Sequence, residues 1–258
     1  MQKSYIWSLP TRIFHWLFVL FILAAFITGD EDRLLNYHAV IGYGIFILLA
    51  FRIIWGFIGP KHSLFKDFPI GIKKAKEFMS NIFDSEQKYI GHNPMASYAM
   101  MGMFILCFLL IITGALAFGI QEGKGIFSSF NSSFFKEMEL FEEIHELFSG
   151  LLIALIVAHI VGVFSDRFLH KKYETLNSIF TGYKMSHNKE SIKLNIGQKL
   201  FAFIMFLVFI AFLVFNIYEP KNILVASSYT PIDFKKQNEL FVSECASCHT
   251  LYPPIAFT

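Results

Sequence analysis

The sequence predicts an all-α membrane protein with five membrane-spanning helices, and three observations lead to this prediction. First, 55% of the 258 residues are hydrophobic and only 16% are charged, whereas soluble proteins have about 25% charged residues. Second, the mean hydropathy is +0.51. Third, long apolar stretches rich in Phe recur along the chain. A soluble protein of this size cannot bury so much apolar surface, so the composition excludes a soluble enzyme, a disordered chain and a nucleic-acid-binding protein.

Five stretches reach or approach the roughly 20 apolar residues that a spanning helix needs. They cover about residues 10–28, 38–57, 96–120, 144–164 and 200–217. Each is expected to be helical, because lipid cannot satisfy the hydrogen bonds of an open backbone. The first stretch has a signal peptide as its alternative. Arg12 and His15 interrupt its apolar run, however, and no clear A-x-A cleavage site follows.

The connections between these stretches alternate between basic and acidic. Lys and Arg dominate the N-terminus and the segments 58–95 and 165–199, whereas Asp and Glu dominate 29–37 and 121–143. Because Lys and Arg accumulate in cytoplasmic loops, we expect a protein of the bacterial inner membrane with a cytoplasmic N-terminus and a periplasmic tail after Tyr218. Within the longest basic loop, residues 71–83 form either a short amphipathic surface helix or a solvated connector.

Four of the nine histidines lie in or at the ends of the expected helices. An ionisable residue inside a bilayer indicates a functional site by default, and its alternative is a structural histidine that bonds across helices. His145 and His159 are 14 residues apart on the fourth helix, so they share one side of it and lie about 21 Å apart along its axis. The helix directions then put His15 at the inner depth of His159, and His38 at the outer depth of His145.

Two facing imidazoles in an apolar slot are typical axial ligands of a haem iron. A zinc site normally needs four N or S ligands, and a proton relay would favour carboxylates, so two bis-histidine b haems are the favoured interpretation. Arg12 and Arg52 stand at the inner ends of the first two helices, where each either pairs with a haem propionate or extends to lipid phosphates. Four further histidines are expected to be solvated in loops: His62, His92, His170 and His187.

The polar tail carries a C-x-x-C-H motif made of Cys245, Cys248 and His249. This motif attaches a c-type haem covalently, with His249 as the proximal iron ligand; a chance C-x-x-C or a disulfide is the alternative. No Met or His follows His249, so either the sequence is truncated or a partner supplies the distal ligand. A flexible tether of about 26 residues is expected to join the fifth helix to Cys245. Cys107, in the third helix, is expected to be a packing residue.

Several local sequences together resemble the prokaryotic cytochrome b561 family, which includes the b-type subunit of nickel–iron hydrogenases. They are residues 7–16 (WSLPTRIFHW), the run from His38 through Gly42 to 52–59 (RIIWGFIG), 91–94 (GHNP), His145 with Glu146, and 159–163 (HIVGV). The resemblance covers about residues 5–185. It implies a four-helix bundle with two b haems and transfers the family's four axial ligands to His15, His38, His145 and His159. Residues 244–254 resemble the first haem site of a small periplasmic di-haem cytochrome c, whose second motif is missing here.

The chain is therefore expected to have three parts: a di-haem cytochrome b bundle (1–185), a linker with a fifth helix (186–218), and a periplasmic tail with an incomplete cytochrome c module (219–258). The expected function is electron transfer across the membrane, between a quinol pool or a dehydrogenase or hydrogenase partner and a c-type haem of the respiratory chain. One alternative is a quinol:cytochrome c oxidoreductase, which needs a quinone pocket that the sequence does not locate. The other is a non-redox membrane anchor or transporter with structural histidines.

Overall fold

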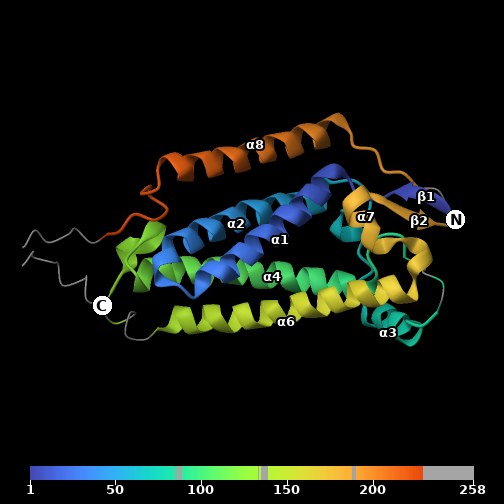
Figure 1. Ribbon diagram of the computed structural model, residues 1–258, viewed down its shortest axis with the longest axis horizontal. Helices are drawn as coiled ribbons and strands as arrows, with labels where there is room; N and C mark the ends of the chain where they lie inside the picture. Colours follow the sequence, from blue (N-terminus) through green and yellow to red (C-terminus); the bar gives the residue numbers. More distant parts are fainter. Residues whose placement is uncertain (85, 87–88, 133, 135–138, 188–189, 229–258) are drawn as a thin grey trace, which may run out of the picture.

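The computed structural model describes residues 1–84, 86, 89–132, 134, 139–187 and 190–228 (Figure 1). Five helices are long and apolar enough to span a membrane, which confirms the predicted all-α membrane fold. They are α1 (Leu9–Gly29), α2 (Leu35–Ile58), α4 (Pro94–Leu116), α6 (Leu140–Leu169) and α8 (Ile196–Tyr218). The helices begin one to four residues earlier than predicted, because residues outside the apolar stretches also adopt helical geometry. Asn195, for example, caps α8 by accepting from the Gln198 backbone N–H (2.8 Å).

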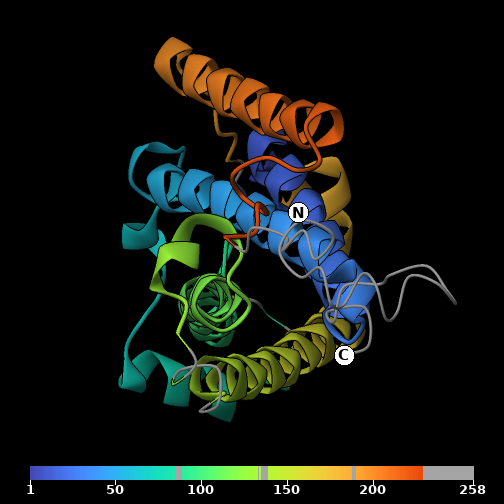
Figure 2. The same ribbon diagram turned by 90° about the vertical axis from the view of Figure 1, so that its left-hand side faces the viewer.

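Four of these helices form a bundle, and α8 lies against its outside (Figure 2). Helix α1 packs along α2, α4 packs along α6, and α2 also contacts α4 and α8. Within the described residues, α6 makes little close backbone contact with α1 or α2. In the described part of the chain, the seam between α6 and the α1–α2 pair therefore lacks close packing of the helix backbones.

At one end of the bundle, here called the tail end, the chain after α8 folds back onto the loop that follows α4. Helix α4 finishes in a π-helical turn (Ala117–Gln121), and a 3-10 helix (Gly125–Phe130) follows. The backbone N–H of Gly125 donates to the Ala226 carbonyl, and the N–H of Ser228 donates to the Gly123 carbonyl, both at 2.8 Å. Both glycines have positive φ, and a Cβ on Gly125 would lie 2.8 Å from the Leu224 oxygen. We call residues 219–228 the strap.

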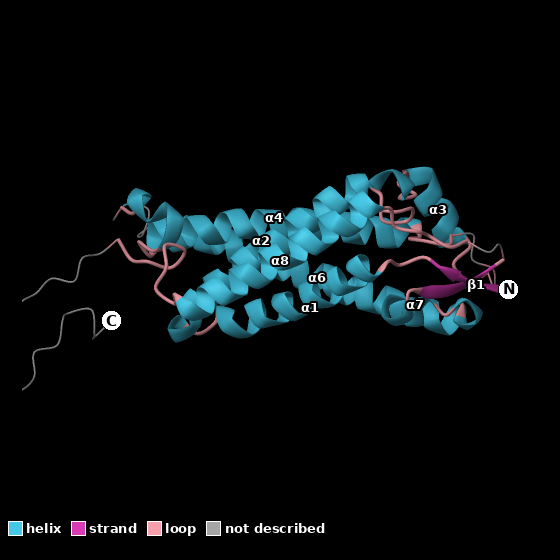
Figure 3. Cartoon of the chain, turned by 90° about the horizontal axis from the view of Figure 1, so that it is seen from above, coloured by secondary structure: helices cyan, strands magenta, loops and turns pink. Residues whose placement is uncertain are grey.

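The opposite, N-terminal end carries a small cap (Figure 3). Strand β1 (Gln2–Tyr5) pairs antiparallel with β2 (Tyr183–Ser186), and α7 (Thr175–Thr181) precedes β2. Helix α3 (Ile72–Ser80) forms within the basic loop, so the helical alternative for residues 71–83 is correct. The strand pairing was not predicted, because the two strands are short and about 180 residues apart in sequence.

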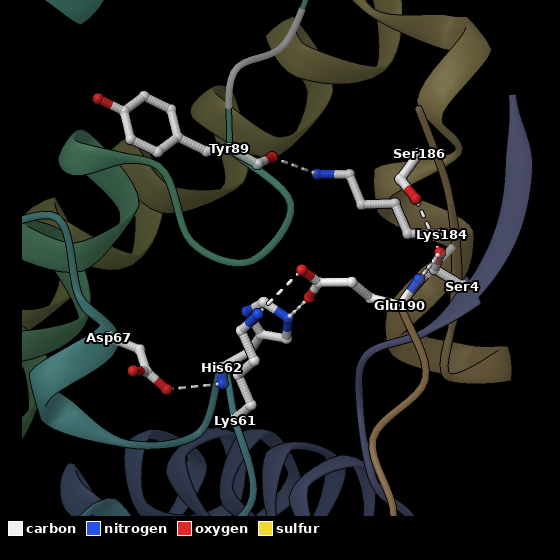
Figure 4. Close-up of polar contacts among 8 residues, drawn as sticks. All are labelled: Ser4, Lys61, His62, Asp67, Tyr89, Lys184, Ser186 and Glu190. Atoms are coloured by element: carbon white, nitrogen blue, oxygen red, sulfur yellow. Dashed lines mark hydrogen bonds and ion pairs between the residues drawn. The ribbon is translucent and has the colours of Figure 1, made fainter. Parts of the chain in front are cut away.

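A polar network ties the cap together (Figure 4). Glu190 accepts from Lys61 Nζ at 2.9 Å and contacts His62 Nε2 at 3.0 Å. Its backbone N–H donates to Ser4 Oγ at 3.0 Å. Lys184 is buried and donates to the Tyr89 carbonyl at 3.3 Å. Burial lowers the pKa of this amine to about 8.

The prediction that the loop histidines are solvated is wrong for three of the four. His62 and His170 are buried, and His170 is held between the Asp166 carboxylate and the Asp84 carbonyl. His92 lies between the rings of Trp7 and Phe68. His187 is exposed, as expected. The first three are enclosed because the cap folds over their loops, an event that depends on long-range contacts.

Acidification is expected to loosen the cap. The Lys61 ammonium is the main cause that lowers the pKa of Glu190, so this carboxylate stabilises the fold above its unfolded pKa and loses that effect as pH falls through its folded value. Burial lowers the pKa of His62, so protonation near pH 6 favours the unfolded form. Both effects have the same sign. Amide hydrogen exchange in β1 and β2, corrected for intrinsic rates, should therefore rise between about pH 7.5 and 5 through His62, and rise again below about pH 4.5 as Glu190 is protonated.

The variant Glu190→Gln should raise this exchange at neutral pH and abolish the further rise below about pH 4.5. Glu122→Gln is the matched control, because Glu122 is an exposed carboxylate at the tail end of the bundle. Exchange that stays constant with pH in the wild type would contradict the assignment of the cap's stability to these two groups.

Candidate functional site

The first histidine pair lies near the tail end of the bundle, where the start of α2 meets the first turns of α6. The rings of His38 and His145 have centroids 6.0 Å apart and planes inclined by 77°. His38 Nδ1 lies 3.0 Å from the Ala25 carbonyl oxygen. Because a carbonyl only accepts hydrogen bonds, Nδ1 carries the proton, and Nε2 keeps its lone pair for a metal.

His145 is oriented in the same way by a threonine on α4. Thr113 Oγ1 donates to the Leu109 carbonyl at 2.9 Å, so its oxygen accepts from His145 Nδ1 at 3.1 Å. Nε2 of His145 is therefore also left with a free lone pair. The neighbouring Gly114 leaves the room that this ring needs, since a Cβ there would lie 2.8 Å from His145 Cε1. The sequence interpretation missed Thr113; a Thr-Gly pair inside an apolar helix was the available signal.

The second histidine pair lies toward the N-terminal end. His15 on α1 lies within electrostatic range of His159 on α6. His15 Nδ1 is buried and has no hydrogen-bond partner in the described chain, and the ring contacts Trp16 edge-on at 5.0 Å. The structure thus brings His38 and His145 into ring contact and places His15 within electrostatic range of His159, the grouping expected from their depths.

The two arginines, predicted to play equivalent roles, differ in their surroundings. Arg12 donates a hydrogen bond to the Phe180 carbonyl and so ties α1 to α7. Arg52 is 2% exposed and lies among the rings of Phe65, Phe68 and Phe104. The alternative that Arg52 extends to lipid phosphates is therefore wrong, because its side chain turns into the protein.

The separation of His38 and His145 fits a haem iron held between two imidazoles. An imidazole–metal bond is about 2 Å long, so two rings that shared one iron would have centroids roughly 6 Å apart, as this pair has. All four histidines are only half-buried, on the seam where α6 stands apart from α1 and α2. In the part of the chain that the structure describes, no group of three or more His, Cys, Asp and Glu side chains is placed to hold a metal ion, so these pairs lack the further ligands that zinc would need.

The tail motif lies outside the described residues, so Cys245, Cys248 and His249 have no place in this geometry. Cys107 is a free, buried thiol in the core of the bundle, as expected of a packing residue. It packs in a cluster with Phe104 and Leu152, which joins α4 to α6.

Comparison with known proteins adds an independent observation. The sequence model of the prokaryotic cytochrome b561 family matches residues 6–182. The chain is 28% identical over 156 residues to the probable Ni/Fe-hydrogenase 1 B-type cytochrome subunit of Escherichia coli (strain K12), an alignment that covers 50% of this chain and 66% of that protein. It is 24% identical over 222 residues to the probable Ni/Fe-hydrogenase B-type cytochrome subunit of Rhizobium leguminosarum bv. viciae, covering 73% and 92%. No solved structure matches the chain significantly. The family match includes all four paired histidines, whereas α8 and the tail lie beyond it.

Proposed function

Because the chain belongs to the prokaryotic cytochrome b561 family, and is therefore a multi-pass bacterial membrane b-type cytochrome of electron transfer, we propose that it holds two b haems and conducts electrons between the two membrane faces. His15 and His159 would hold one haem, and His38 and His145 the other. The observation that carries this proposal is the His38–His145 pair, whose ring separation and free Nε2 atoms suit axial ligation.

The residues of the chain set the position and the surroundings of each iron. When bound, haem supplies reversible one-electron chemistry. The Ala25 carbonyl and Thr113 fix the ring orientation and tautomer of the tail-end pair, and hydrogen bonds of this kind to Nδ1 would also raise the basicity of the Nε2 that binds iron. Helix α6 separates the two levels by about 21 Å along its axis, so the two sites lie at different depths of the membrane.

The orientation and the partners are part of the same proposal. The basic connections lie at the N-terminal end of the bundle, which favours a cytoplasmic cap and a periplasmic tail (Figure 1). The two relatives described above are named as hydrogenase subunits, which supports a hydrogenase or another dehydrogenase as one partner. A quinone pool and a c-type haem on Cys245 and Cys248 are the remaining candidates. A quinol:cytochrome c oxidoreductase activity is the second candidate function, favoured by the tail motif.

Haem content tests the proposal directly. The purified chain should give a pyridine haemochrome spectrum with two b haems per protein, both removed by acid acetone. Where the maturation machinery is present, one covalent c haem should remain after extraction. The variant Cys245→Ser with Cys248→Ser controls for the covalent haem and should leave the extractable pair unchanged. A protein without extractable haem would overturn the function, and one b haem per chain would overturn the two-site arrangement.

A further inference from the structure

We propose that Arg52 and His92 form a buried anion seat, and that it binds a carboxylate of the haem held by His15 and His159. This inference rests on the proposed function and extends it, because it assigns a partner to a buried cation that the axial ligands do not explain. It also separates Arg52 from Arg12, which the sequence could not distinguish.

The first argument is depth. Arg52 follows His38 by 14 residues on α2, and His159 follows His145 by the same 14 residues on α6. Both helices are continuous over these spans, so each step is about 21 Å along the axis and returns to nearly the same face. Arg52 therefore lies on nearly the same face of α2 as His38, about 21 Å closer to the N-terminal end of the bundle.

The second argument is the unpaired charge. Arg52 is 2% exposed, and its guanidinium carbon lies 5.2–5.8 Å from the ring centroids of Phe65, Phe68 and Phe104. Nη2 has only the Met100 sulfur at 4.0 Å, and Nη1 is buried with no hydrogen-bond partner in the described chain. Cation–π contacts compensate only part of the lost hydration of a buried charge. An anion is the partner that such a group requires.

The third argument is His92, which provides a hydrogen-bond donor beside Arg52. Its ring lies between Trp7 (4.8 Å) and Phe68 (4.9 Å), and Phe68 also contacts Arg52. His92 is within electrostatic range of both Arg52 and His159. Burial, followed by the nearby Arg52 guanidinium, lowers the pKa of His92 to about 3. His92 is therefore neutral at physiological pH and offers one N–H without adding charge.

A carboxylate is the ligand that matches these groups. The planar guanidinium fork binds carboxylates through two parallel hydrogen bonds, and a b haem carries two propionate carboxylates. A lipid phosphate is a poorer candidate, because Arg52 is enclosed by protein rather than turned to the membrane surface. Arg12 already donates to the Phe180 carbonyl, so we assign it to the cap.

The test is a redox titration of both haems in purified Arg52→Gln, Arg52→Lys and Arg12→Gln variants, together with haem content. A cation beside a haem favours the reduced state. Arg52→Gln should therefore shift the reduction equilibrium of the haem on His15 and His159, here called the inner haem, about tenfold toward the oxidised form, or 59 mV for one electron. The potential of the haem on His38 and His145 should not change. Arg52→Lys should restore part of the shift, and Arg12→Gln should shift the potential of the same haem less than Arg52→Gln does, because Arg12 donates to the Phe180 carbonyl.

A second variant covers the case in which Arg52→Gln fails to fold or loses both haems. His92→Phe keeps an aromatic ring between Trp7 and Phe68 but removes the N–H, and should shift the inner haem about threefold in the same direction. Selective loss of the inner haem from Arg52→Gln, reversed by Lys, also supports the seat. The proposed seat would be overturned if the potentials of both haems shifted equally. It would also be overturned if neither Arg52→Gln nor His92→Phe shifted the potential of the inner haem. A wild-type protein without haem would instead overturn the proposed function.

Discussion

Alanine at His38 or His145 is expected to remove the same single haem, and alanine at His15 or His159 is expected to remove the other. Each haem would depend on two histidine ligands from different helices. A site that keeps only one imidazole should therefore bind haem weakly. The haem content of each variant should fall from two b haems to one. Pyridine haemochrome analysis gives the number, and a redox titration identifies which haem remains.

His187→Ala is the matched control, because His187 is an exposed histidine outside both pairs. Thr113→Val provides a graded version of the same test. It keeps the shape of the side chain but removes the acceptor of His145 Nδ1, and the loss of a hydrogen-bond partner behind a metal-binding histidine typically costs about 10–100-fold in metal affinity. Loss of different haems from the two members of one pair would contradict the pairing, whatever the total haem content.

Replacing Cys245 and Cys248 together by Ser is expected to abolish covalent haem and to slow electron exchange with a soluble periplasmic acceptor. Both thiols are needed for the two thioether bonds, so covalent haem, seen by peroxidase staining of a denaturing gel, should fall to zero. Reduction of the b haems by an electron donor on the cytoplasmic side should be unchanged, because the paired histidines are not altered. Stopped-flow spectroscopy of membranes separates the two rates.

The strap refines this expectation. Its backbone pairing with Gly123 and Gly125 makes residues 219–228 part of the folded protein, so the prediction of a flexible tether that begins at residue 219 is wrong for these ten residues. The rest of the predicted tether, residues 229–244, lies outside the described residues. Cys107→Ser should leave covalent haem unchanged. If exchange is equally fast without the tail cysteines, the tail is not part of the electron path.

The features that the sequence predicted well are those encoded by periodicity and hydropathy. The five helices follow from apolar length, and the grouping of His15 with His159 follows from helix direction and rise, because a straight helix converts sequence spacing into depth. The features it missed depend on which segments meet in space. The burial of Arg52 requires Phe65 and Phe68 from the following loop, and hydropathy along α2 alone does not place them there.

The same reason accounts for the cap and for the support of His145. Glu190 meets His62 only after β1 and β2 have paired, and the pairing of two four-residue strands leaves almost no pattern in the sequence. Thr113 supports His145 only because α4 lies along α6 in one particular register. Predictions from local spacing therefore located the two histidine pairs, whereas the groups packed around them required the fold.

The loosely packed seam beside α6 has a consequence for assembly. Close backbone packing joins α6 mainly to α4, whereas the proposed haems would be held jointly by α6 and the α1–α2 pair. A ligand that binds only the assembled bundle stabilises it by about 4 kcal/mol when its free concentration exceeds its Kd a thousandfold. The stability of the inserted chain would then depend on the supply of haem. The single-histidine variants should accordingly be more sensitive to proteolysis than the wild type, in proportion to the haem they lose.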